Sequence, residues 1–214
     1  MLFLLTLTVF SCYKKPNYMS RISDLRTNVY YGESGKYSLT CYPEVRENPY
    51  LNDGYTGELC NVVIFKLKFI EDFSVTDSIG VSFCLNEKDY AAEFEYNSVS
   101  CCMTASIITD SLPVNSFPVY VNYQTNKTPM VLTSLLLKST VSYTSAVDAL
   151  ASSSYTEAVN LLNEKNGDYE LYARLIESDG LNYWYIGFGL GDNKIDAYLI
   201  DGETCEIIAR RQSA

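Results

Sequence analysis

Short segments in which apolar and polar residues alternate dominate residues 28–142. The alternation is clearest in residues 62–69, where Phe65, Leu67 and Phe69 are expected on one face of a strand and Lys66 and Lys68 on the other. The same criterion predicts seven strands in this region, at 28–31, 36–42, 60–69, 78–85, 90–96, 102–109 and 117–123. The third of them contains residues 62–69. Turn-forming clusters of Gly, Asn and Asp separate these segments, which indicates short antiparallel connections.

Six or seven strands within about 110 residues are typical of an antiparallel β-sandwich. We therefore predict an immunoglobulin-like sandwich for residues 28–142, although the chain lacks the Cys, Trp and Cys spacing of true immunoglobulin domains. The chain contains 19 Tyr and 9 Phe, an aromatic content that favours strands over helices.

The apolar spacing changes after residue 142. Residues 146–151 and 155–163 have helical spacing, and Ser152-Ser-Ser154 between them predicts either one broken helix or two short ones. Four strand-like segments follow, at 169–177, 183–189, 194–201 and 205–210. Their connections are short, so we expect a four-stranded antiparallel meander covered on one face by the helix. The predicted fold class is mostly β, with an α+β part at residues 143–214.

The C-terminal part resembles a PepSY-type domain. Residues 145–150 match the opening of its helix, 183–188 a central strand and 197–208 the closing hairpin. The family commonly has Asp-x-x-Thr-Gly in that hairpin, and here Cys205 follows Thr204 where glycine is usual. The last residue of such a turn favours a positive φ, which glycine adopts at little cost. The resemblance implies a small extracytoplasmic domain of the kind found in peptidase propeptides and bacterial lipoproteins.

The first eleven residues are mostly apolar and carry no charged side chain. They are too few to cross a bilayer as a helix, and they fit the core of a secretory signal. Val9-Phe10-Ser11-Cys12 resembles the lipobox of bacterial lipoproteins, which implies cleavage before Cys12 and acylation of its thiol. The predicted organisation is a signal peptide at 1–11, a tether at 12–27, a β-sandwich at 28–142 and a PepSY-like domain at 143–214. A buried N-terminal strand and a plain cleaved signal are the alternatives.

Composition narrows the chemistry further. The chain has no His, which removes the usual general base and the commonest metal ligand. Its net charge of −10 argues against nucleic acid as a partner. We predict no cofactor. The cysteines after Cys12 are expected to be mostly reduced and buried, and the first pairing to check is Cys41 with Cys60 or Cys84.

Two segments contain candidate site residues. The polar segment 43–58 holds carboxylates that are candidate Ca²⁺ ligands, namely Glu44, Glu47, Asp53 and Glu58, with Asn52 beside them. The alternative is an ordered loop in which Arg46 pairs with a carboxylate and Pro49-Tyr50 packs on the edge of the sandwich. The second segment, Tyr183-Trp184-Tyr185, is a candidate aromatic platform for a partner. Because alternate residues of a strand face opposite ways, Trp184 is expected to point away from both tyrosines, with at least one side in the core.

These features favour a non-catalytic, lipid-anchored protein on the extracytoplasmic face of a bacterial cell membrane. In this hypothesis the lipid anchor provides the membrane contact, and the folded part binds a macromolecular partner, for which a protein is expected. A regulator or inhibitor of an extracellular peptidase is the second hypothesis, based on the PepSY resemblance. A hydrolase that uses carboxylates alone is the third.

Overall fold

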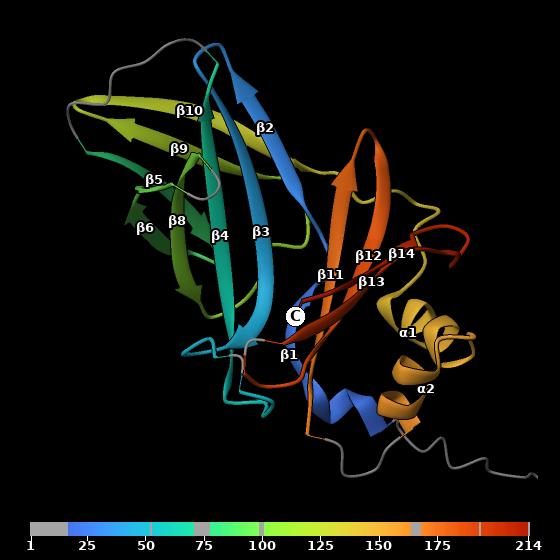
Figure 1. Cartoon of the computed structure of the whole chain (residues 1–214). Helices are drawn as coiled ribbons and strands as arrows, with labels where there is room; N and C mark the ends of the chain where they lie inside the picture. Colours follow the sequence, from blue (N-terminus) through green and yellow to red (C-terminus); the bar gives the residue numbers. More distant parts are fainter. Residues whose placement is uncertain are drawn as a thin grey trace, which may run out of the picture.

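The computed structural model describes most of the chain after the leader, and its fold is mostly β. The described residues are 17–51, 53–70, 78–98, 101–163, 168–192 and 194–213. Their strands join into one 14-stranded sheet of mixed direction, and two helices lie beside its C-terminal part (Figure 1). Cys12 lies outside these residues. No helix in the described part is long and apolar enough to cross a membrane.

The first half of the chain forms two packed layers. One layer contains β2 (Tyr30–Ser34), β3 (Tyr37–Glu47), β4 (Leu59–Phe69), β8 (Cys102–Thr109) and β7 (Glu95–Asn97). The other contains β10 (Asn126–Ser134), β9 (Phe117–Tyr123), β5 (Ile79–Leu85) and β6 (Lys88–Glu93). The consecutive strands β3 and β4 are neighbours in one layer, whereas immunoglobulin domains place their second and third strands in opposite sheets.

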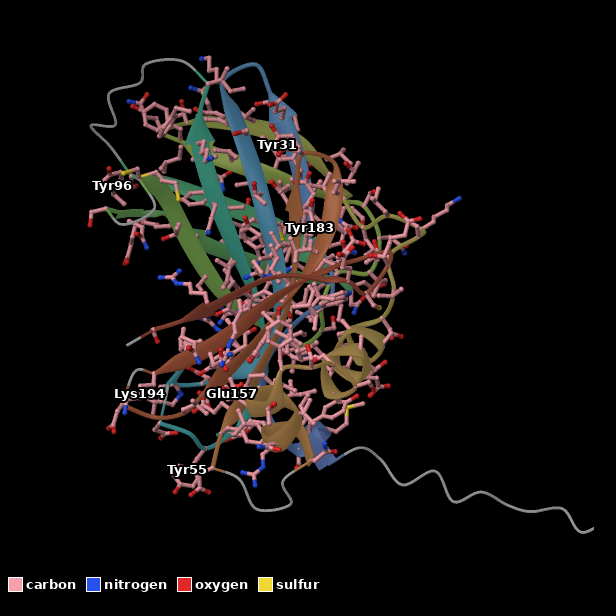
Figure 2. The ribbon with its side chains drawn as sticks, turned by 45° about the vertical axis from the view of Figure 1, so that its right-hand side comes forward. Tyr31, Tyr55, Tyr96, Glu157, Tyr183 and Lys194 are labelled. Carbon is pink, nitrogen blue, oxygen red and sulfur yellow. The ribbon has the colours of Figure 1, made fainter. Side chains whose placement is uncertain are left out.

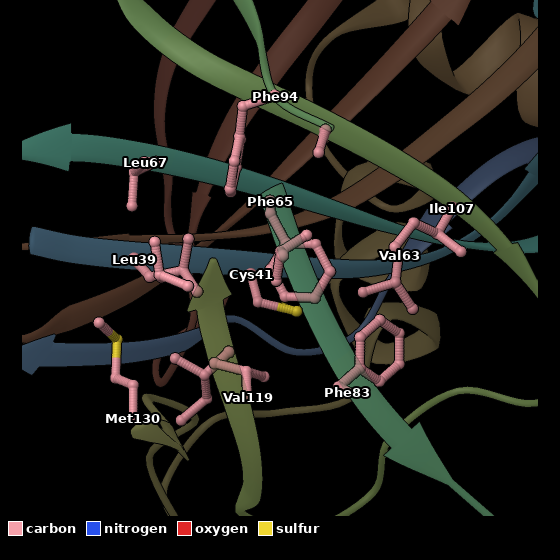
Figure 3. Packing of buried hydrophobic residues seen from close by; sticks show 14 of the residues in the cluster. Leu39, Cys41, Val63, Phe65, Leu67, Phe83, Phe94, Ile107, Val119 and Met130 are labelled. Carbon is pink, nitrogen blue, oxygen red and sulfur yellow. The ribbon is translucent and has the colours of Figure 1, made fainter. Parts of the chain in front are cut away.

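The alternation predicted for residues 62–69 is present in β4. Phe65 and Leu67 are fully buried between the layers, while Lys66 and Lys68 face outward. Side chains from the opposite layer, including Phe83 and Val119, pack against them (Figure 3). Burial of these apolar side chains is the main stabilising term for this half.

The chain passes from one layer to the other at Phe94. Before it, β6 pairs with β5, and after it, β7 pairs with β8. Phe94 is buried in the core at the crossing point, while Tyr96 in β7 is 65% exposed. This change of partners links the two layers along an edge where an open sandwich would leave unpaired strands.

The predicted tether at 12–27 is wrong for residues 17–27. A short 3₁₀ helix, η1 (Asn17–Arg21), leads directly into β1 (Ile22–Arg26). Strand β1 pairs with β3 in the first half and with β11 (Glu170–Ser178) in the second, so it joins the two halves into one sheet. The segment looks polar in sequence because Asp24 and Arg26 alternate with apolar residues, yet Tyr18 and Ile22 belong to the second core.

The second half is the predicted helical segment followed by a meander. Helix α1 (Tyr143–Ala151) begins after Ser142, whose side chain accepts a hydrogen bond from the Ser145 N–H, and α2 (Thr156–Asn163) follows the serine break. Strands β11, β12 (Leu181–Gly189), β13 (Ile195–Asp201) and β14 (Ile207–Gln212) pair antiparallel in chain order. Both helices pack on the same face of this meander and enclose the second core (Figure 1).

Two details concern the cysteines. Cys205 has φ of 62°, the left-handed conformation expected at this turn position, and Asp201 holds the turn by accepting hydrogen bonds from the backbone of Glu203 and Thr204. None of the six described cysteines forms a disulfide bond, so Cys41 bonds to neither Cys60 nor Cys84. Only Cys41 and Cys102 are buried, which corrects the expectation that most of them are. The exposed cysteines lie at turns or on outward strand positions, where no apolar layer covers them.

Candidate functional site

Strand β1 brings charged residues from three strands onto one face of the sheet. Leu25 faces the helices and the second core, so Asp24 and Arg26 point to the opposite face. The pairing register sets Asp24 beside Arg46 of β3 and Arg26 beside Arg174 of β11. The face opposite the helices therefore carries a charged cluster at the seam between the two halves.

Three arginines in this cluster share two buried carboxylates. The Nε and Nη2 atoms of Arg174 donate to Asp24 Oδ2 at 2.8 and 2.5 Å. Arg26 Nε donates to Glu44 Oε1 at 2.8 Å, and Arg46 Nη1 lies 3.8 Å from Glu44 Oε2. The side chains of Asp24 and Glu44 are each 2% exposed, whereas the arginines are 17 to 28% exposed. The negative charges are thus enclosed while parts of the guanidinium groups reach solvent.

Asp24 is held in an environment that disfavours its charge. Burial raises the pKa of its carboxyl group, and the neighbouring Arg174 opposes this shift. Its second oxygen, Oδ1, is buried and has no hydrogen-bond partner. Arg174 is consequently the main group that compensates the Asp24 carboxylate.

Two further buried carboxylates fix the loop between β3 and β4. Glu47 accepts hydrogen bonds from the backbone N–H groups of Leu51 and Gly57, at 3.1 and 2.8 Å. Glu170, in the second half, accepts from the N–H groups of Asp53 and Gly54 at 3.1 and 3.0 Å. A loop of the first half is therefore attached to the start of β11.

Glu170 is also bound from the other side. Tyr172 and Ser23 donate their hydroxyl groups to Glu170 Oε2, at 2.5 and 3.4 Å. Burial raises the pKa of Glu170, while the hydrogen bonds from Tyr172 and the loop backbone oppose the shift. With four donors and an exposure of 0%, this side chain is a structural acceptor rather than a group that reaches a ligand.

The four Ca²⁺ candidates do not share a site. Glu44 is bound to arginines, Glu47 accepts from its own loop, and Asp53 Oδ1 accepts from the Tyr55 N–H. Glu58 is exposed, and Asn52 lies outside the described residues. Across the described ranges, no group of three or more Cys, Asp or Glu side chains has the geometry to hold a metal ion. The alternative prediction of an ordered loop with Arg46 beside a carboxylate describes the segment better.

The three residues of the candidate aromatic platform separate as the alternation predicts. Trp184 is 2% exposed, donates from Nε1 to the Val141 carbonyl at 2.9 Å and packs edge-on against Tyr143. Tyr183 and Tyr185 point to the other face, where Tyr183 is visible on the β11–β12 hairpin (Figure 2). Trp184 is therefore a core residue, and only the two tyrosines remain available to a partner.

Aromatic rings lie among the arginines on this face. The guanidinium carbon of Arg26 is 4.3 Å from the centre of the Tyr42 ring, and Lys66 Nζ is 5.0 Å from the same ring. Arg174 lies between Tyr50, Tyr172 and Tyr185, at 6.0, 5.3 and 5.9 Å. These distances are typical of cation–π contacts. We call the accessible members the tyrosine–arginine face: Arg26, Tyr42, Arg46, Tyr50, Lys66, Arg174 and Tyr185.

The tyrosine–arginine face differs in charge from the chain as a whole. It contains four cations, and the two carboxylates beneath it, Asp24 and Glu44, leave two positive charges in excess, whereas the whole chain carries −10. An open hollow of about 490 Å³ adjoins it and includes Arg46 and Lys66 together with the carboxylates of Glu93 and Glu95. The cations of the tyrosine–arginine face favour an anionic surface on a partner.

Comparison with known proteins gives no relative for this chain: no family model, curated protein or solved structure matches it.

Proposed function

We propose that the protein is a non-catalytic, lipid-anchored, extracytoplasmic protein of a bacterium that binds a macromolecular partner. The observation that carries the proposal is the tyrosine–arginine face, a solvent-accessible surface with excess positive charge on an acidic protein. Tyrosine and arginine are the residue types most often central to protein interfaces, because they combine a large contact area with hydrogen-bonding groups. The partner best suited to this face is a protein with an acidic surface.

A binding role suits the carboxylates better than hydrolysis does. A hydrolase that uses two carboxylates requires both to reach the substrate. The acids that lie together at the seam, Asp24, Glu44 and Glu170, are buried and are held by arginine, hydroxyl or backbone donors. Their arrangement supports a structural role beneath a binding surface.

Acylation of Cys12 would hold the folded part close to the membrane. The chain enters η1 at Asn17, five residues after Cys12. Five fully extended residues span at most roughly 18 Å. The anchor proposed here is therefore short, and the folded part would lie next to the lipid headgroups rather than on a long tether.

The anchor is tested by metabolic labelling with a fatty-acid analogue. Wild type should be labelled and a Cys12→Ala variant should not. Equal absence of label in both would remove the anchor from the proposal and leave the binding role to be judged separately.

Binding is tested by crosslinking capture from a cell-envelope extract with two charge-matched double variants. Arg46→Glu with Lys66→Glu alters the tyrosine–arginine face, and Lys138→Glu with Lys194→Glu changes the net charge equally at exposed sites outside it. The protein captured by wild type should be retained by the second variant and lost by the first. Equal capture by all three would refute the role of this face. If the captured protein is a peptidase and the chain inhibits it, the regulator hypothesis takes precedence.

A further inference from the structure

A second surface feature lies on the other layer of the sandwich. An open hollow of about 640 Å³ is present on the outer side of β5, β6 and β9. Its lining residues are small or polar: Ser78, Gly80, Val81, Ala91, Ala92, Glu93, Asn122 and Gln124. The first core separates this layer from the strands that carry Arg46 and Lys66, and of the residues that line this hollow only Glu93 also lines the one beside the tyrosine–arginine face.

Strand register explains how the hollow forms. Asn122 pairs with Gly80, and Gly80 pairs with Glu93, so these three residues form one row across the sheet. The next outward row is Tyr120, Ser82 and Ala91. Gly80 and Ala91 have little or no side chain, which leaves open space between the amide of Asn122 and the carboxylate of Glu93. A Cβ atom at Gly80 would lie 3.0 Å from the Ala92 carbonyl oxygen, so glycine also suits the close approach of β5 and β6.

The groups around the hollow favour hydrogen bonding over charge pairing. Asn122 Nδ2 donates to Ser82 Oγ at 3.0 Å and keeps one further N–H, while Asn122 Oδ1 is buried and has no hydrogen-bond partner. Glu93 is exposed and adds two acceptor oxygens. The lining contains a carboxylate and no Lys or Arg, which disfavours phosphates and carboxylates as ligands. Its apolar members are small, which disfavours an aliphatic or aromatic ligand that needs an enclosed apolar pocket.

An aromatic ring stands beside the hydrogen-bonding row. Tyr120 is 40% exposed and occupies the outward position next to Ser82, with Lys127 Nζ 5.5 Å from the centre of its ring. A tyrosine ring offers a flat apolar surface and keeps a polar hydroxyl at its end. A carboxylate such as that of Glu93 can accept from two neighbouring hydroxyl groups of one ligand.

We propose that this hollow binds a neutral saccharide. A sugar ring presents hydroxyl groups at its edge, suited to Asn122 and Glu93, and C–H groups on its face, suited to Tyr120. The class follows from the lining, which is open and polar with one carboxylate and no cation, and from the adjacent exposed ring of Tyr120, over which Lys127 lies. The site goes beyond the proposed binding of an acidic protein, since it uses a different layer of the sandwich.

The test uses NMR titration of the isotopically labelled folded chain with neutral tetrasaccharides of glucose, mannose and galactose. At least one should shift the backbone amide signals of Gly80, Ala91 and Asn122 in a saturable manner. Asn122→Ala should weaken that binding about tenfold, because the amide donor of the site is removed. Ala91→Trp should weaken it similarly, because Ala91 is exposed and a large side chain there fills the hollow without entering the core.

The control variant is Lys138→Ala, at an exposed position outside both hollows, which should bind the same saccharide as wild type does. Circular dichroism of each variant verifies that it is folded. Absence of saturable shifts with all three sugars, or unchanged affinity in Ala91→Trp, would overturn the saccharide site. Either result is separate from the proposed function, which is measured through Cys12 labelling and through the Arg46 and Lys66 double variant.

Discussion

The most direct test of the seam is replacement of Arg174 by methionine. Methionine retains much of the apolar stem of arginine and removes the guanidinium group that donates twice to Asp24. Asp24 would then be a buried carboxylate without its principal partner. Removing one member of a buried ion pair typically costs about 3–5 kcal/mol, because the remaining charge is left uncompensated. We expect a loss within this range at pH 7.

A second variant identifies the cause of that loss. In Asp24→Asn combined with Arg174→Met, the uncompensated charge is absent, so most of the lost stability should return. Urea unfolding measures both changes. Trp184 is a suitable fluorescence probe, since it is the only tryptophan and is buried in the second core.

The dependence on pH provides an independent check. Burial raises the pKa of Asp24 above its ordinary value of 3.8, and removal of Arg174 takes away the group that most opposes this shift. An acid with a raised pKa in the folded state binds its proton more tightly there than in the unfolded chain, so folding is favoured as the pH falls. The stability gap between Arg174→Met and the double variant should therefore narrow from pH 7 toward pH 4. A gap that is absent at pH 7, or that does not change with pH, would refute this explanation.

Three further predictions concern the turns and the loop. Cys205→Gly should be more stable than Cys205→Ala by about 1 kcal/mol in urea unfolding. Both variants lose the thiol, but only glycine adopts the positive φ without steric cost, so equal stability would contradict this prediction. Gly202→Ala should cost about 1–3 kcal/mol, because its Cβ would meet the Asn182 carbonyl oxygen; an unchanged urea midpoint would contradict it. Glu170→Ala should destabilise the chain by about 1–3 kcal/mol and speed proteolysis within residues 48–58, because the backbone N–H groups of Asp53 and Gly54 lose their acceptor. A cleavage pattern like that of wild type would exclude the attachment of this loop by Glu170.

Local alternation was sufficient to predict most strands and the C-terminal meander. In β4 the pattern of Phe65, Lys66 and Leu67 directly reflects one buried and one exposed face. The positive φ at Cys205 was also foreseeable, because the turn sequence requires that conformation whichever residue occupies the position. These features depend on residues close together in the chain.

Strand β1 could not be predicted in the same way. Its charges suggested solvent exposure, but Asp24 is buried because Arg174, 150 residues later, compensates it. Glu170 and the 48–58 loop are similarly distant in sequence. The acidic segment 43–58 suggested a cation site because the sequence does not reveal which N–H and guanidinium groups will meet its oxygens. The seam is a non-local feature, so only the folded arrangement identifies it.

The corrected role of residues 17–27 also determines how an anchored molecule would be oriented. Helix η1 and α2 lie at one end of the molecule, and the β2–β3 turn lies at the opposite end (Figure 1). A linker of roughly 18 Å from Cys12 would keep the η1 end toward the bilayer. Because β1 continues from η1 into the seam, hydrogen bonding to both β3 and β11, η1 and the two halves form one connected unit. In an anchored molecule, the tyrosine–arginine face at the seam and the proposed saccharide site on the sandwich would then lie along the sides of that unit.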